Sequence, residues 1–183
     1  MTKEQLRQYR TTKKEYRQIE QRLRNMENRP ESEEEILQPL REFYREKLAA
    51  LDEKYAQAVA AGQIRTLLFG DRFPFRYMAE DYGLGYYAAF RGCSAETEAS
   101  FETVAFLAGK VDELGLTAVM VIEGADQRIA QTIVQSTQSK DQRILAMDSM
   151  QSVTARDVQD GASYLAIMEK DLSVLREALI GKG

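Results

Sequence analysis

The hydrophobic pattern of this chain changes after Gly62, and that change constrains the fold more than any other feature. Residues 118–122 (AVMVI) form a continuous apolar run, as expected of a strand that is covered on both faces. Apolar segments at 65–69, 85–90 and 144–147 also predict strands, and helical patterns separate them. Strands that alternate with helices predict an α/β fold with a four-stranded, mostly parallel sheet and right-handed crossovers.

The helices expected around this sheet are marked by residues that begin and end helices. Ser100 is a favourable N-cap for a helix whose apolar face ends before Gly115, and glycine is a favourable residue just past a helix. The other helices are expected at 75–82, at 126–137, and from Tyr164 to a stop at Gly181. In parallel sheets flanked by helices, ligands bind beyond the carboxyl ends of the strands.

Before Gly62 the apolar residues follow a helical period. Residues 2–28 carry a narrow apolar stripe, which predicts one amphipathic helix. A capping-box pattern at Ser32 and Glu35 predicts the start of a second helix, which Pro39 must begin or bend. Two long amphipathic helices in succession favour an antiparallel hairpin, or an arm that pairs with another chain.

These two patterns predict two domains. Residues 1–62 are expected to form a helical hairpin or arm, and residues 63–183 an α/β lobe. The excess of Lys and Arg before residue 24 suits a solvated helix face better than a nucleic-acid surface, so nucleic acid is not an expected partner. Self-association through residues 1–60 is the stronger expectation, because an exposed apolar stripe requires cover.

Composition excludes several kinds of chemistry. The chain has one cysteine, Cys93, which excludes an intramolecular disulfide, and it has no histidine, the usual general base near neutral pH. We therefore expect no enzyme, and any binding site must use carboxylates, hydroxyls, the thiol or the backbone. The N-terminus has no apolar leader and no segment is apolar enough to span a membrane, so the chain as written is expected in the cytoplasm.

Three acids are expected at one edge of the sheet. Asp71 follows the first predicted strand, Glu123 follows the third and Asp148 follows the fourth, and the carboxyl ends of parallel strands meet at the same edge. Two interpretations remain open: the acids cap helices and face solvent, or they converge on a cation. Carboxylates without histidine favour a hard cation such as Mn²⁺, Ca²⁺ or Mg²⁺ over Zn²⁺.

Four motifs follow one another along the chain: FGDRFPFRYMAEDYGL, GCSAETEASFETVAFLAGKVDELGLTAVMVIEG, ILAMDSM and YLAIMEKDLSVLREAL. In this order they resemble the C-terminal lobe of the solute-binding proteins of zinc and manganese ABC transporters, over about residues 45–181. The helix from about residue 45 resembles the one that joins the two lobes in that family. The first 30 residues resemble the basic helical leaders of small phage-encoded proteins.

The resemblance implies that zinc or manganese is held between two lobes by histidines and carboxylates, outside the cytoplasm, for an ABC transporter permease. It implies Asp148 as a metal ligand, Asp71 where the family has His or Glu, and Glu123 as an acid near the cleft. The ligand position after the first strand is ambiguous by one residue, and Arg72 in that position would repel a cation. No segment here resembles the family's N-terminal lobe with its histidines, so the implied site is incomplete. The alternative is an oligomerising coiled-coil module whose lobe is a scaffold that binds nothing.

Overall fold

The structure is a computed structural model that divides the chain into two compact units, Met1–Ala49 and Ala50–Gly183. Apart from residues 17 and 21, the helix expected over residues 2–28 lies outside the described residues, as do Ser32 of the predicted capping box and the thiol of Cys93. The described residues are 17, 21, 33–90 and 98–181.

Helix α2 (Glu33–Ala61) belongs to both units, with Pro39 inside it. Its last part contributes Leu51, Tyr55 and Val59 to the core of the second unit. This burial explains why the second unit begins within the helix, earlier in the chain than the domain boundary expected at Gly62. The boundary at Gly62 stays a prediction.

The second unit contains a four-stranded sheet in the order β2-β1-β3-β4, and all of its strand pairs are parallel. This arrangement confirms the predicted α/β class. The strands are β1 (Thr66–Arg72), β2 (Gly85–Phe90), β3 (Ala118–Ile122) and β4 (Arg143–Met147).

The helices that follow α2 confirm most of the expected elements. Ser100 caps α4, since its side chain accepts a hydrogen bond from the N–H of Thr103, and Gly115 ends the helix with a φ of 61°. No helix in the described part of the chain is long and apolar enough to cross a bilayer. The helices are α3 (Arg76–Asp81), α4 (Phe101–Leu114), α5 (Arg128–Ser136), α6 (Ala155–Gln159) and α7 (Tyr164–Ala178).

Helix α6 was not expected from the sequence. Its five residues include none that is buried, so no apolar period marks it. A capping box between Thr154 and Asp157 supports its first turn instead.

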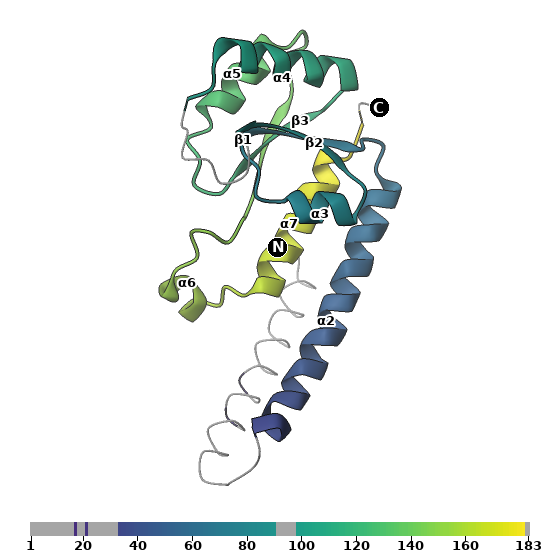
Figure 1. Ribbon diagram of the computed structural model, residues 1–183, viewed down its shortest axis with the longest axis vertical. Helices are drawn as coiled ribbons and strands as arrows, with labels where there is room; N and C mark the ends of the chain where they lie inside the picture. The colour runs from purple at the N-terminus through teal and green to yellow at the C-terminus, as the bar shows by residue number, and fades with distance from the viewer. Residues whose placement is uncertain (1–16, 18–20, 22–32, 91–97, 182–183) are drawn as a thin grey trace. The chain divides into compact units, whose positions relative to one another are not determined.

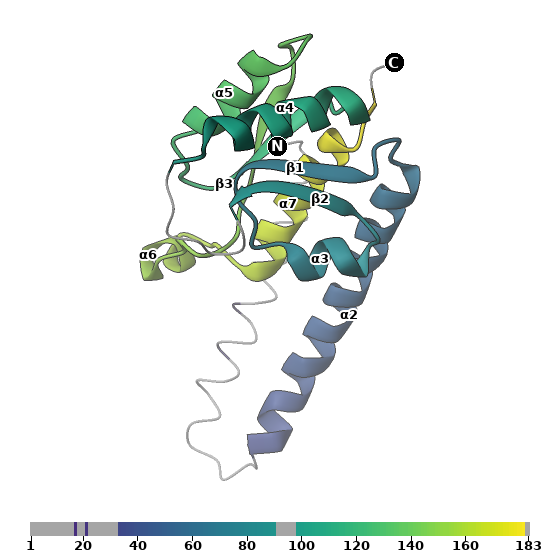
Figure 2. The same cartoon turned by 45° about the horizontal axis from the view of Figure 1, so that its top comes forward.

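Helices cover both faces of the sheet. Figure 1 shows α4 and α5 on one face, with α3 and α7 on the other, and the view in Figure 2 agrees. Side chains of the central strands alternate between the two layers, as strand geometry requires. Phe69 and Met120 pack in the core that includes α7, whereas Leu68 and Val119 pack in the core that includes α4 and α5.

Gly70 allows α5 to approach the end of β1 closely. A Cβ atom at this position would lie 2.7 Å from Cα and 2.8 Å from Cβ of Ala130, closer than real Cβ atoms come to a neighbour. A residue without a side chain is therefore required here. The contact holds α5 against the strand immediately before Asp71.

Candidate functional site

Asp71 lies inside β1 rather than after it. The pairing of β1 with β2 shifts register between Phe69 and Arg72 and then resumes, which carries the strand past the expected end. The carboxylate of Asp71 is buried, and its Oδ2 accepts a 3.4 Å hydrogen bond from the N–H of Ile122 at the end of β3. Asp71 thereby connects the two central strands at their carboxyl ends.

Arg72 modifies the electrostatics around Asp71. Oδ1 of Asp71 accepts a 2.7 Å hydrogen bond from the N–H of Arg72, and the Arg72 Nε lies 3.7 Å from the same oxygen. The Arg72 side chain is 41% exposed, so water screens this pair strongly. The guanidinium still places positive charge beside a predicted metal ligand.

Glu123 follows β3 and holds the loop after β4. Its Oε2 accepts a 2.7 Å hydrogen bond from the N–H of Ser149, and its Oε1 accepts from the hydroxyls of Ser149 at 2.8 Å and Ser152 at 3.3 Å. Burial disfavours the charged form, but these hydrogen bonds outweigh it and lower the pKa of Glu123 below its ordinary value. Glu123 is thus an ionised carboxylate whose two oxygens are both occupied.

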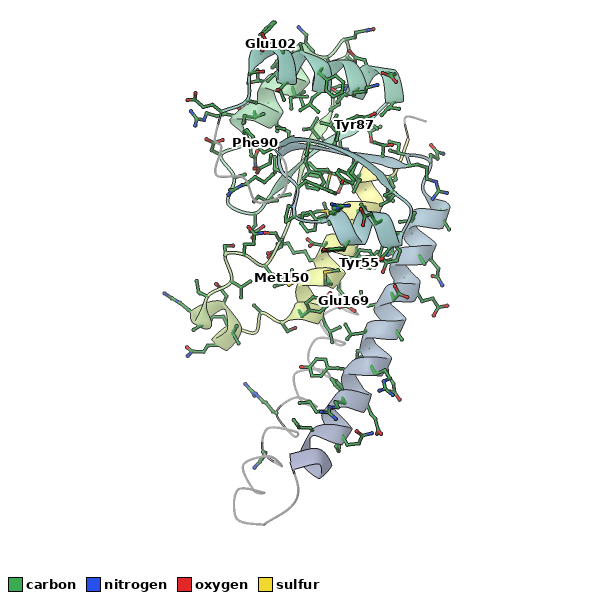
Figure 3. The ribbon with its side chains drawn as sticks, in the orientation of Figure 1. Tyr55, Tyr87, Phe90, Glu102, Met150 and Glu169 are labelled. Atoms are coloured by element: carbon green, nitrogen blue, oxygen red, sulfur yellow. The ribbon has the colours of Figure 1, made fainter. Side chains whose placement is uncertain are left out.

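Asp148 is the first residue after β4 and turns the chain toward α6. Its Oδ1 accepts a 2.9 Å hydrogen bond from the N–H of Met150, a local bond typical of Asp in turns. Met150 has a φ of 61° and lies on the loop between the sheet and α6 (Figure 3). Among the described residues, no hydrogen bond reaches the Oδ2 atom of Asp148.

Asp171 on α7 is a buried acid that the sequence analysis missed. The residue is 1% exposed, and its Oδ1 accepts a 2.9 Å hydrogen bond from the N–H of Asp148. Its Oδ2 has no partner within the described residues. Burial is the main cause that raises the pKa of Asp171 to about 6. The hydrogen bond from the N–H of Asp148 lowers this pKa, whereas the negative charges of Asp148 and Glu123 raise it.

A signal for Asp171 was present in the sequence. The residue lies three positions after Met168 and four before Leu175, both members of the predicted apolar face of the last helix. A charged residue at that helical spacing is expected to be buried and therefore to have a specific partner.

Hydrogen bonds connect the three predicted acids at one edge of the sheet. Asp71 binds the residue before Glu123, and Glu123 binds the residue after Asp148. Within the described residues, however, no group of three or more His, Cys, Asp or Glu side chains is arranged to hold a metal ion. The described residues of this edge therefore present carboxylates but no closed metal site.

Comparison with known proteins gives relatives that bind zinc. The chain is 29% identical over 140 residues to the zinc-binding lipoprotein AdcA of Streptococcus pneumoniae, a match that covers 76% of this chain and 27% of AdcA. The zinc-binding protein AdcA of Streptococcus pyogenes is 27% identical over 133 residues, which is 73% of this chain and 25% of that protein. The chain therefore spans about a quarter of the length of these relatives.

Solved structures show the same fold. The Zn(II)-bound ZnuA-like domain of Streptococcus pneumoniae AdcA matches with a TM-score of 0.62 and 27% identity, over 79% of this chain and 52% of that domain. The periplasmic zinc-binding protein TroA of Treponema pallidum matches in fold, with a TM-score of 0.66 and 18% identity, over 80% of this chain and 53% of TroA.

The family comparison covers more of the sequence than these pairwise matches. A family model described as ZnuA, zinc-uptake complex component A, periplasmic, matches residues 9–178. This range contains the whole sheet, every helix from α2 to α7 and the acids at the carboxyl edge. The chain belongs to the ZnuA family.

Proposed function

We propose that this chain binds zinc as part of the solute-binding component of an ABC transporter. The observation that carries the proposal is the family match over residues 9–178, which includes the carboxylates at the carboxyl edge of the sheet. The curated relatives are named as zinc-binding, and the family is described as a component of a zinc-uptake complex. The function is binding without chemistry, in which carboxylate oxygens replace water molecules around the ion.

Asp148 is the ligand that the local geometry supports best. Its Oδ2 accepts no hydrogen bond from the described residues, and the free oxygen belongs to a residue directly beyond a strand end. Asp71 is the second ligand, and it must first give up a backbone hydrogen bond on one oxygen. Glu123 can bind the ion only if the bonds from Ser149 and Ser152 open, so its main contribution is to hold the loop and add negative charge.

The ligand set makes the choice of metal testable. Zinc is the proposed cargo because the relatives bind it, while manganese is the alternative because oxygen ligands without histidine suit a harder ion. A site with only a few protein oxygens binds divalent ions weakly, so we expect dissociation constants between about 10⁻⁶ and 10⁻³ M. The relatives are far longer than this chain, and further ligands from such a longer protein would tighten binding.

The proposed location and partner follow from the same family. The family is described as periplasmic, which supports a location outside the cytoplasm. It does not support the cytoplasmic location expected from the N-terminus. The proposed macromolecular partner is the permease of the transporter, which receives the ion.

The test is a calorimetric titration of the metal-free full chain with Zn²⁺ and with Mn²⁺. We expect saturable binding by the wild-type chain. Asp148→Asn should bind at least about 10-fold more weakly, because the substitution removes the negative charge that attracts the ion. Asp71→Asn should weaken binding as well. The ion with the lower dissociation constant is the one that this ligand set prefers.

A matched control separates the site from general charge effects. Asp112 accepts a hydrogen bond from the N–H of Gln138 and lies at the end of α4, near the amino ends of the strands. Asp112→Asn removes one negative charge there and should leave the titration unchanged. Equal binding in wild type and Asp148→Asn would remove Asp148 from the site, and no saturable binding of either ion by the wild-type chain would reject the function.

A further inference from the structure

We propose that Asp171 is a positioning residue, which fixes the backbone of Asp148 from the buried face of α7 and so sets the direction of the Asp148 carboxylate. The inference rests on the proposed function and deepens it, because it concerns how the same cation site is held in shape. Nothing in the proposal requires Asp171 to touch the ion.

The loop after β4 is held by an unusual run of hydrogen bonds. Three successive backbone N–H groups, those of Asp148, Ser149 and Met150, donate to three different carboxylates. The acceptors are Asp171 for the first, Glu123 for the second and Asp148 itself for the third. The bond to Asp171 is the one that fastens this turn to α7.

The bond to Asp171 acts at the residue that carries the proposed ligand. The N–H of Asp148 is held at 2.9 Å by Asp171, and its Oδ1 is held at 2.9 Å by the N–H of Met150. With both its backbone and one of its oxygens restrained, Asp148 presents the other oxygen in one orientation. Loss of the hydrogen bond to Asp171 would remove the restraint on the backbone of Asp148 and lower the population of the loop conformation that binds the cation.

The burial of Asp171 indicates that the acid has a role besides packing. Its neighbours on the same face of α7, Leu172 and Leu175, are buried apolar residues, and one oxygen of Asp171 has no partner among the described residues. A buried carboxylate without full pairing is costly, and an apolar residue of similar size would pack there at least as favourably. Substitution by leucine should therefore release the loop without unfolding the protein.

Two substitutions at this position separate the hydrogen bond from the charge. Asp171→Asn keeps an oxygen that can accept from the N–H of Asp148 and removes the charge, whereas Asp171→Leu removes the acceptor. Amide hydrogen exchange at Asp148 measures the restraint without metal, and calorimetric titration with Zn²⁺ and Mn²⁺ measures the consequence for binding. Thermal unfolding of each variant checks that the fold persists.

The expected result is a split between the two variants. Asp171→Leu should lose the exchange protection of the Asp148 amide and weaken binding about 10-fold to 100-fold, the usual effect of removing support behind a metal ligand. Asp171→Asn should keep the protection and most of the affinity. Glu169→Gln, an exposed change on the same helix, should alter neither measurement.

Other results would overturn the inference. Protection and affinity retained in Asp171→Leu would show that the bond does not position Asp148. An equal loss of affinity in Asp171→Asn and Asp171→Leu would assign the effect to charge instead. Failure of the proposed function is visible separately, as absence of saturable binding in the wild-type chain, while exchange at Asp148 still reports whether Asp171 holds the loop.

Discussion

Individual carboxylates at the carboxyl edge of the sheet have different protonation behaviour because their surroundings differ. Glu123 gains hydrogen bonds that stabilise its charged form, so it contributes stability above its unfolded pKa that is lost as pH falls. Asp171 is disfavoured as an anion by burial, with a pKa raised to about 6 from an ordinary 3.8. The two acids therefore change the stability of the fold in opposite directions as pH changes.

A pH titration of stability should reveal Asp171. Between its unfolded and folded pKa values the native state binds more protons than the unfolded state, so the contribution of Asp171 to stability decreases as pH rises from 3.8 to about 6. Replacement by Asn removes this dependence. The stability of Asp171→Asn relative to wild type should rise by about 2–3 kcal/mol between about pH 4 and about pH 7.5.

Urea denaturation at several pH values measures this difference. The comparison between pH values cancels the constant cost of placing an amide at the buried position. Asp112→Asn, which changes an acid distant from Asp171 in the fold, provides the control. A difference between Asp171→Asn and wild type that is the same at all pH values would contradict a raised pKa.

At the scale of elements, the end of β1 depends on its contact with α5. The sequence predicts that this strand ends at Phe69, with Asp71 and Arg72 as a charged pair at the corner between strand and helix. The partner strand restores the pairing of Arg72 with Phe90, and Gly70 accommodates the backbone of Ala130. Tertiary packing therefore overrode local preference at this position.

Gly70→Ala tests that contact. The added methyl group would overlap the backbone of Ala130, which cannot move without shifting α5. We expect a loss of about 1–3 kcal/mol in the free energy of unfolding, the usual range for overpacking a core. Chemical denaturation gives this value, and Gly109→Ala, where a Cβ meets no atom within 4 Å, is the matched control. Equal stability of Gly70→Ala and wild type would show that α5 adjusts freely.

At the scale of the whole molecule, family membership supports one of the functional classes left open by the sequence. The ZnuA family consists of uptake-complex components rather than enzymes, which confirms the expectation that this chain is not an enzyme. It also confirms the resemblance of residues 45–181 to metal-transporter lobes. The expected self-association through residues 1–60 gains no support from the relatives.

Truncation tests which part of the chain forms the folding unit. Leu51, Tyr55 and Val59 of α2 are buried in the lobe, and the Tyr55 hydroxyl donates a 2.8 Å hydrogen bond to the carbonyl of Met168. Each such side chain contributes about 1.5–3 kcal/mol by burial, so losing all three removes much of a typical domain's 5–15 kcal/mol. A fragment 50–183 should unfold cooperatively, whereas 63–183 should not fold. Circular dichroism during heating distinguishes them, and cooperative unfolding of both would support the boundary at Gly62.

The order and type of the strands and of the helices α3, α4, α5 and α7 were determined by the sequence itself, whereas α6 was not predicted. Residues 85–90 and 118–122 were predicted with the bounds that the structure has, and Ser100 and Gly115 bracket α4 as expected. Hydrophobic period and capping residues act over short segments, so they are readable without knowledge of the fold. Parallel topology then placed the acids after β3 and β4 at one edge of the sheet.

Tertiary structure alone decided what those acids do. The bonds of Asp71 to Ile122, of Glu123 to Ser149 and of Asp148 to Asp171 join residues far apart in the chain. Whether a carboxylate oxygen is occupied or free depends on such contacts, because a neighbouring N–H satisfies it as well as a cation can. Asp171 became part of the candidate site for the same reason: only the packing of α7 against β4 brings its buried oxygen to the backbone of Asp148.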